Sequence, residues 1–102
     1  MLIVLTTVPN IAEAEALAKK IIASRTAACV QIVPRMTSVY LWEGEIQNDN
    51  ENLMLIKTLP EKWDTLRDLI SANHSYEVPE IVAIDAEMVS EPYLEWLQGV
   101  VA

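Results

Sequence analysis

The sequence predicts an α+β fold in which two β-α-β units follow one another in a single domain, residues 1–102. Short apolar, β-branched runs alternate with segments whose apolar residues recur at helical spacing. A faint repeat supports this reading, since Thr7 and Pro9 recur 51 positions later as Thr58 and Pro60. Two such units joined by a hairpin form a split β-α-β-β-α-β sandwich of the ferredoxin-like type. Right-handed crossovers then place both helices on one face of a sheet with strand order 4-1-3-2.

The first unit begins with the run Leu2–Thr7, which is apolar enough for a central strand buried on both faces. Asn10 is the expected cap of a helix over residues 11–24, whose apolar residues fall on one side. The run Ala27–Val33 predicts the next strand, and Pro34 directly after it is typical of an edge strand or a bulge.

A long hairpin is predicted in the middle of the chain. Met36–Trp42 continues the extended pattern, with Glu43-Gly44 as the favoured turn and Asn48-Asp49-Asn50 as the alternative. A regular strand over Glu45–Thr58 would be roughly 45 Å long, whereas a compact domain of this length is about 33 Å across. The hairpin must therefore overhang its own domain. Because apolar strand edges are normally covered, we expect a closed homo-oligomer in which the hairpin lies on a neighbour.

The second unit repeats the pattern. Pro60 begins a helix that is predicted to reach Asn73, with its apolar residues along one side. Val78–Asp85 is the expected fourth strand, and Ser90 is the expected cap of a short C-terminal helix.

Composition and charge exclude several classes of function. Fifteen acidic residues against seven Lys and Arg give a net charge of −8, so nucleic acids and anionic membranes are not expected partners. A single cysteine excludes an internal disulfide framework, and the sequence contains neither a paired-His zinc motif nor a phosphate-binding loop. The apolar N-terminal run is too short to span a bilayer and has no basic region before it. We therefore expect a cytoplasmic protein.

The only cysteine and the only histidine are the candidate metal ligands. For Cys29, on an apolar strand, a buried inert thiol is the simpler interpretation and a soft metal ligand the alternative. His74 follows the second helix, where it complements the helix dipole or binds a metal together with Glu77 or Glu80. No nucleophile with a base and an orienting group is evident, so we expect no enzyme activity and no required cofactor.

Two further sets of residues are candidates for a site. The acidic residues 43, 45, 49 and 51 are interpreted as a solvated hairpin tip, since their spacing matches no calcium loop. A cleft between subunits is the second candidate site, and its lining residues would be Tyr40, Trp42, Lys57, Tyr76 and Glu77. For Lys57, a purely structural pairing with a carboxylate is the alternative interpretation.

Five segments of the chain carry the landmarks of a known family. They are Ala27–Val30, Ser38–Ile46, Leu55–Thr58, His74–Ile81 and Tyr93–Leu97. In this order and spacing they resemble the CutA divalent-cation tolerance proteins over almost the whole chain. The resemblance implies a ferredoxin-like fold and a tightly packed homotrimer, similar in architecture to the PII signalling proteins. It also implies a role in tolerance of divalent metal ions, of which copper is most often named.

The chain departs from that family's pattern at three positions. Ser75 replaces the proline of a common His-Pro-Tyr triplet, and Thr6 and Asn73 stand where some relatives carry a cysteine and a second histidine. Two potential metal ligands are therefore missing. We expect either weak Cu(II) or other divalent-metal binding at His74 and acidic side chains, or a site shared between subunits. The alternative function is a PII-like module that binds a small effector or a protein partner in the cleft.

Overall fold

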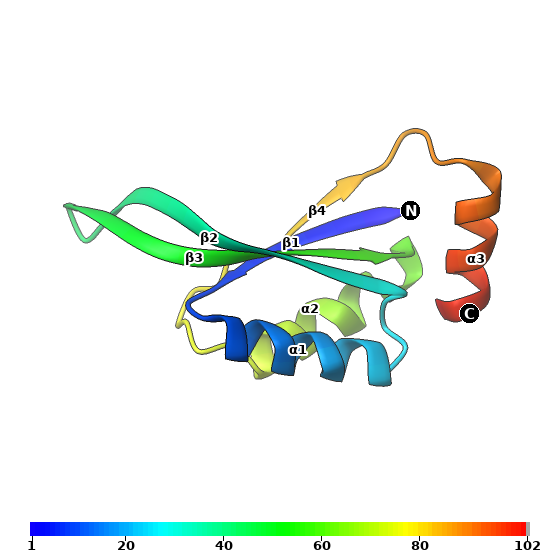
Figure 1. Ribbon diagram of the computed structural model, residues 1–102, viewed down its shortest axis with the longest axis horizontal. Helices are drawn as coiled ribbons and strands as arrows, with labels where there is room; N and C mark the ends of the chain where they lie inside the picture. Colours follow the sequence, from blue (N-terminus) through cyan, green and yellow to red (C-terminus); the bar gives the residue numbers. More distant parts are fainter. Residues whose placement is uncertain (102) are drawn as a thin grey trace.

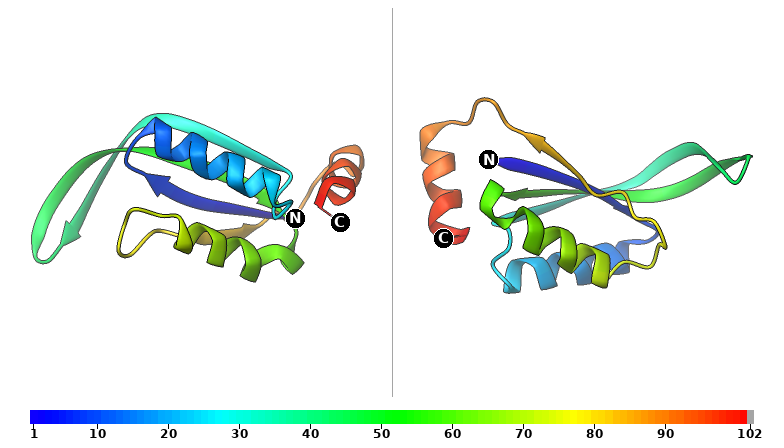
Figure 2. Two further views of the ribbon diagram at one scale, coloured as in Figure 1. Left: turned by 90° about the horizontal axis from the view of Figure 1, so that it is seen from below. Right: turned by 180° about the vertical axis from the view of Figure 1, so that it is seen from behind.

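The computed structural model describes residues 1–101 and confirms the predicted α+β fold class. The elements are β1 (Leu2–Val8), α1 (Ile11–Ala23), β2 (Cys29–Trp42), β3 (Glu45–Thr58), α2 (Trp63–Ala72), β4 (Val82–Asp85) and α3 (Glu91–Val101). The strands form one antiparallel sheet in the order β2-β3-β1-β4, as predicted. Helices α1 and α2 lie side by side on one face of the sheet, and α3 stands beyond its end near the N-terminus (Figures 1 and 2).

Helix α1 begins at the predicted cap. The Asn10 side-chain oxygen accepts a hydrogen bond from the backbone N–H of Glu13 (2.9 Å), and the Asn10 amide donates to the Glu13 carboxylate (3.1 Å). The backbone N–H groups of the first turn have no acceptor within the helix. The Asn10 side chain supplies an acceptor for one of them.

The hairpin turns at Glu43-Gly44, where Gly44 has a φ of 79° that favours glycine. The alternative turn at residues 48–50 is wrong, because these residues pair in register with residues 37–39 of β2. The pairing of β2 with β3 shifts register between Val33 and Met36, which is the bulge expected at Pro34. Strand β2 is also an edge strand of the sheet, where proline is tolerated.

The hairpin overhangs the domain as the length argument predicted. The molecule measures 45 × 26 × 22 Å, and the hairpin tip extends well beyond the helices (Figure 1). Three apolar side chains near the tip are largely exposed, Val39 at 64%, Leu41 at 70% and Ile46 at 75%. An exposed apolar surface of this kind is typical of an interface with another chain.

Two predicted boundaries need correction. The fourth strand begins at Val82 rather than Val78, because its partner β1 pairs with it only over Leu2–Leu5. Pro79 also lacks the N–H that a ladder position requires. The second helix begins with a 3₁₀ turn at Pro60–Lys62 before the α-helical hydrogen bonds start.

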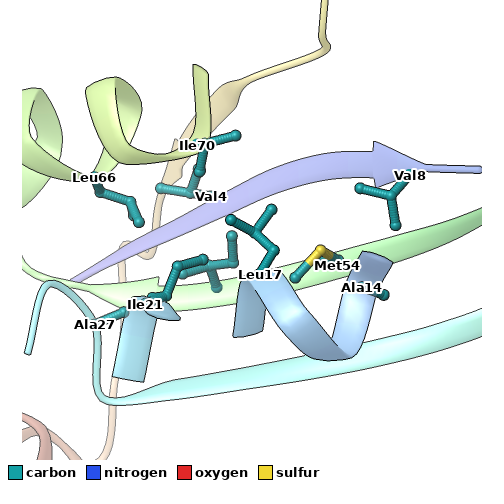
Figure 3. Close-up of a cluster of buried hydrophobic side chains, with 10 residues drawn as sticks. Val4, Val8, Ala14, Leu17, Ile21, Ala27, Met54, Leu66 and Ile70 are labelled. Atoms are coloured by element: carbon teal, nitrogen blue, oxygen red, sulfur yellow. The ribbon is translucent and has the colours of Figure 1, made fainter. Parts of the chain in front are cut away.

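The hydrophobic core lies between the sheet and helices α1 and α2 (Figure 3). It is built from Val4, Val8, Ala14, Leu17, Ile21, Ala27, Met54, Ile56, Leu66 and Ile70. Two threonines are fully buried with it, and they differ in their bonding. The Thr58 hydroxyl donates to the carbonyl of Thr26 at 2.6 Å, whereas the Thr6 hydroxyl has no hydrogen-bond partner within residues 1–101.

Candidate functional site

A cavity of about 720 Å³ opens between the hairpin and the loop that follows α2. That volume falls in the range of small-molecule sites, roughly 300–1,000 Å³. Its lining consists of Thr7 from β1, Ser38, Val39, Tyr40, Trp42, Gln47 and Glu51 from the hairpin, and Ser75, Tyr76, Glu77, Val78 and Glu80 from the loop. The cavity therefore collects four of the five residues predicted for the cleft, all but Lys57.

His74 connects the loop after α2 to the central strand β1 through hydrogen bonds. Its Nδ1 accepts a hydrogen bond from the backbone N–H of Tyr76 (3.0 Å), and its Nε2 lies 2.8 Å from the carbonyl oxygen of Thr7. Because the first bond uses the lone pair on Nδ1, the proton is on Nε2 and is donated to Thr7. Both ring nitrogens of His74 are thus engaged by the chain itself.

Tyr76 connects the loop to the hairpin. Its hydroxyl donates to Oε2 of Glu51 at 2.8 Å, and its ring centroid lies 4.9 Å from that of His74. Burial, followed by this hydrogen bond to Glu51, raises the pKa of Tyr76 well above its ordinary value. A phenol is protonated at neutral pH even with its ordinary pKa of about 10, and the raised pKa keeps Tyr76 a donor to higher pH.

Glu51 is the most deeply buried acidic group of the cavity, with only 7% of its surface exposed. One of its carboxylate oxygens is bound by Tyr76, while the other has no hydrogen-bond partner within residues 1–101. The interpretation of residues 43–51 as a solvated tip is therefore wrong for Glu51. The second oxygen is not among the fully buried unsatisfied atoms of residues 1–101, so it keeps access to solvent and can accept a hydrogen bond from a ligand donor.

A second phenol-carboxylate pair lies further along the hairpin. The Tyr40 hydroxyl donates to the Asp49 carboxylate on the facing strand, and this bond is the main cause of a raised pKa for Tyr40. The bond orients the exposed Tyr40 side chain, and Tyr40 and Trp42 both line the cavity.

The electrostatic character of the cavity is acidic. Its lining contains three carboxylates, Glu51, Glu77 and Glu80, and none of the lining residues is Lys, Arg or His. Together with the overall charge of −8, this gives the cavity a negative potential that attracts cations and repels anions.

Cys29 and Lys57 lie elsewhere in the chain. They face each other across β2 and β3, and Lys57 also pairs with Ile3. Thr7, which His74 contacts, is four residues further along β1, or about 13 Å at strand spacing. The Lys57 ammonium instead sits 5.3 Å from the centroid of the Tyr93 ring. Within one chain, therefore, Cys29 is not close to His74, and Lys57 does not line the cavity.

Metal ions and membranes were considered above as partners, and two features of residues 1–101 concern them. No group of three or more His, Cys, Asp or Glu side chains is arranged to hold a metal ion in that part of the chain. Within the same residues, no helix combines the length and apolar character that crossing a bilayer requires.

Comparison with known proteins gives consistent matches. Residues 2–100 match the family described as CutA1 divalent ion tolerance protein. The divalent-cation tolerance protein CutA of Thermus thermophilus is 44% identical, over 94% of this chain and 93% of its own length. The chloroplastic protein CutA of Arabidopsis thaliana is also 44% identical, over 96% of this chain, but the chain spans only 54% of that relative. The solved structure of the Thermus thermophilus protein superposes with a TM-score of 0.95 at 42% identity, covering all of both chains.

Proposed function

Because this chain belongs to the CutA1 family of divalent ion tolerance proteins, we propose that it contributes to metal tolerance by binding divalent cations weakly, Cu(II) among them. The observation that supports direct binding is the acidic lining of the cavity. Carboxylate oxygens suit hard divalent cations, and imidazole and carboxylate together suit Cu(II).

In this proposal the loop after α2 supplies the ligands, which form no ready-made group of three in residues 1–101 and come together only as the metal binds. Glu77 and Glu80 lie three positions apart on the loop and both line the cavity. His74 joins them only by giving up its bond to the Tyr76 N–H or to the Thr7 carbonyl. That exchange opposes binding and is the reason we propose a weak site. Cys29 takes part only where a second copy of the chain brings it close.

Metal titration followed by native mass spectrometry tests this function. The protein, with Cys29 kept reduced, is titrated with Cu(II) and Zn(II). We expect integral uptake that saturates, and a tenfold or greater loss of Cu(II) affinity in both His74→Ala and Glu77→Gln, about 1.4 kcal/mol. Glu15→Gln is the matched control, because it removes the same charge from an exposed position on α1. A diffuse uptake that never saturates in the parent protein would contradict direct binding.

We propose that the assembled form is a homotrimer. The exposed apolar side chains of the hairpin and the unpaired edge of β2 support an assembly in which neighbouring copies cover them. The same mass spectra, recorded before metal is added, measure the number of chains per particle.

A second candidate function is a PII-like module that binds a small effector. The cavity supports it, since its volume suits a small molecule and it gathers aromatic and polar side chains from three separate segments. Both candidates are binding functions, and we propose no catalytic step for either.

A further inference from the structure

We propose that the cavity is a binding site for a small organic cation, an aliphatic chain that carries two or more ammonium or guanidinium groups. This inference rests on the second candidate function, because it names the ligand class of the same cavity. Two features of the lining support it, namely its carboxylates, one of which is buried, and its aromatic side chains.

The charge of the lining selects the sign of the ligand. Within one chain, three carboxylates and no basic side chain line the cavity, so a phosphate or carboxylate ligand would meet repulsion there without a compensating positive charge. A cation entering the same space is attracted by all three carboxylates. The cavity therefore differs in sign from a site built for anionic metabolites.

Glu51 is the anchor for one end of the ligand. It is more than nine-tenths buried, lines the cavity, and has one carboxylate oxygen without a partner in residues 1–101. An ammonium or guanidinium group supplies N–H donors for that oxygen in a charge-assisted hydrogen bond. The hydroxyl of Tyr76 holds the other oxygen, so the carboxylate is oriented before the ligand arrives.

The aromatic side chains suit the rest of an aliphatic cation. Tyr40, Trp42 and Tyr76 line the cavity together with Val39 and Val78. Aromatic rings attract cationic groups through their π faces and give methylene groups an apolar surface. Glu77 and Glu80 lie on the loop side of the cavity and offer partners for a second positive charge.

The proposed organic cation and the proposed metal ion share Glu77 and Glu80, but only the organic cation uses Glu51. A divalent metal requires several oxygen ligands around one point, whereas an ammonium group needs one anchoring carboxylate and an apolar surround. Glu51 has one oxygen held by a phenol donor, which suits a hydrogen-bonding cation. Substitution of Glu51 therefore separates this inference from metal binding at Glu77 and His74.

Isothermal titration with the metal-free full chain tests the inference. Spermidine and agmatine are the probes, and ATP and glutarate at the same ionic strength are the anionic comparisons. We expect both amines to bind with one molecule per chain and the two anions not to bind. Glu51→Gln should weaken amine binding at least tenfold, whereas Glu15→Gln, the same charge change outside the cavity, should leave it within twofold.

A second variant keeps the test valid if Glu51→Gln fails to fold. Trp42→Leu removes an aromatic ring from a half-exposed hairpin position, away from the core, and should weaken amine binding at least threefold. Amine binding that none of these variants changes would overturn the inference. Binding of ATP but not of amines would also overturn it while leaving the effector function intact. If neither amines nor anions bind, for example because a neighbouring copy fills the cavity, the result would contradict both this inference and the effector function.

Discussion

The phenol of Tyr76 donates a hydrogen bond of 2.8 Å to the buried carboxylate of Glu51, 25 positions earlier in the chain. This bond joins the loop after α2 to the hairpin and closes one side of the cavity. The ring of His74, which holds the backbone N–H of Tyr76, keeps the phenol in place. Three residues thus connect β1, the hairpin and the loop, and this connection shapes the cavity.

Replacing Tyr76 with phenylalanine should destabilise the protein by about 1–2 kcal/mol. The change leaves the ring in place but removes the donor to Glu51, and a hydrogen bond to a charged group contributes about 1.5–3 kcal/mol where water is excluded. We expect the smaller destabilisation of about 1–2 kcal/mol because the cavity is open to solvent. Urea denaturation at pH 7 measures the difference, with Tyr93→Phe as the control. A change below about 0.3 kcal/mol would show that water replaces the phenol without cost.

Stability should fall with pH above about 10. The pKa of Tyr76 is raised in the folded protein, so the folded state holds the phenol proton more tightly than the unfolded chain, where the pKa is about 10. The contribution is fully present below pH 10 and is lost as the pH rises toward the folded pKa. Denaturation between pH 8 and 11 should show this decline, and Tyr76→Phe should flatten it. An equal slope in the variant and the parent protein would assign the decline to other groups.

Thr6→Val should stabilise the protein by about 1 kcal/mol, while Thr58→Val should destabilise it by a similar amount. Both threonines are fully buried, but only the Thr58 hydroxyl has a hydrogen bond. Removing an unsatisfied buried hydroxyl recovers its desolvation cost, whereas removing a bonded one leaves the Thr26 carbonyl without its donor. Thermal and urea denaturation of the two variants make a matched comparison. A stability loss in Thr6→Val would indicate that a buried water satisfies that hydroxyl.

His74→Ala should loosen the loop that follows α2. Without the imidazole, the backbone N–H of Tyr76 loses its acceptor and the Thr7 carbonyl loses a donor. We expect the Tyr76 amide to exchange its hydrogen at least tenfold faster, while amides in the middle of α1 are unchanged. Hydrogen exchange followed by NMR measures both. Unchanged exchange at Tyr76 would mean that the imidazole does not hold the loop in solution.

A charge on the exposed apolar hairpin should break the proposed trimer. Leu41 and Ile46 face each other across the two strands, and both are largely exposed in one chain. If neighbouring copies cover them, Leu41→Glu buries a charge without a partner and should shift the assembly toward monomers. Sedimentation velocity measures the shift, with Glu15→Lys on α1 as a control for charge change. A variant that sediments like the parent protein would place the interface elsewhere.

Much of the fold was predictable because its signals are local. Apolar runs and helical spacing identified the strands and helices in order, and the handedness of the crossovers then determined the strand order β2-β3-β1-β4. The length of the strand over Glu45–Thr58 already required an overhanging hairpin. Four aromatic and acidic residues near element ends were predicted to line a cleft between subunits. One chain already brings these four to a single cavity, and the part of a second subunit in that site stays a prediction.

The tertiary structure alone decided how those residues meet. Nothing near Glu51 in the sequence distinguishes it from the exposed acidic residues of the tip, and its burial depends on a loop that returns 25 positions later. The role of His74 as a tether likewise depends on Thr7, 67 positions away. Cys29 and His74 were both predicted as metal ligands, but they lie at different positions along the sheet because strand register separates them. Periodicity predicts which elements form, whereas contacts between distant residues depend on register and loop path, which no local pattern encodes.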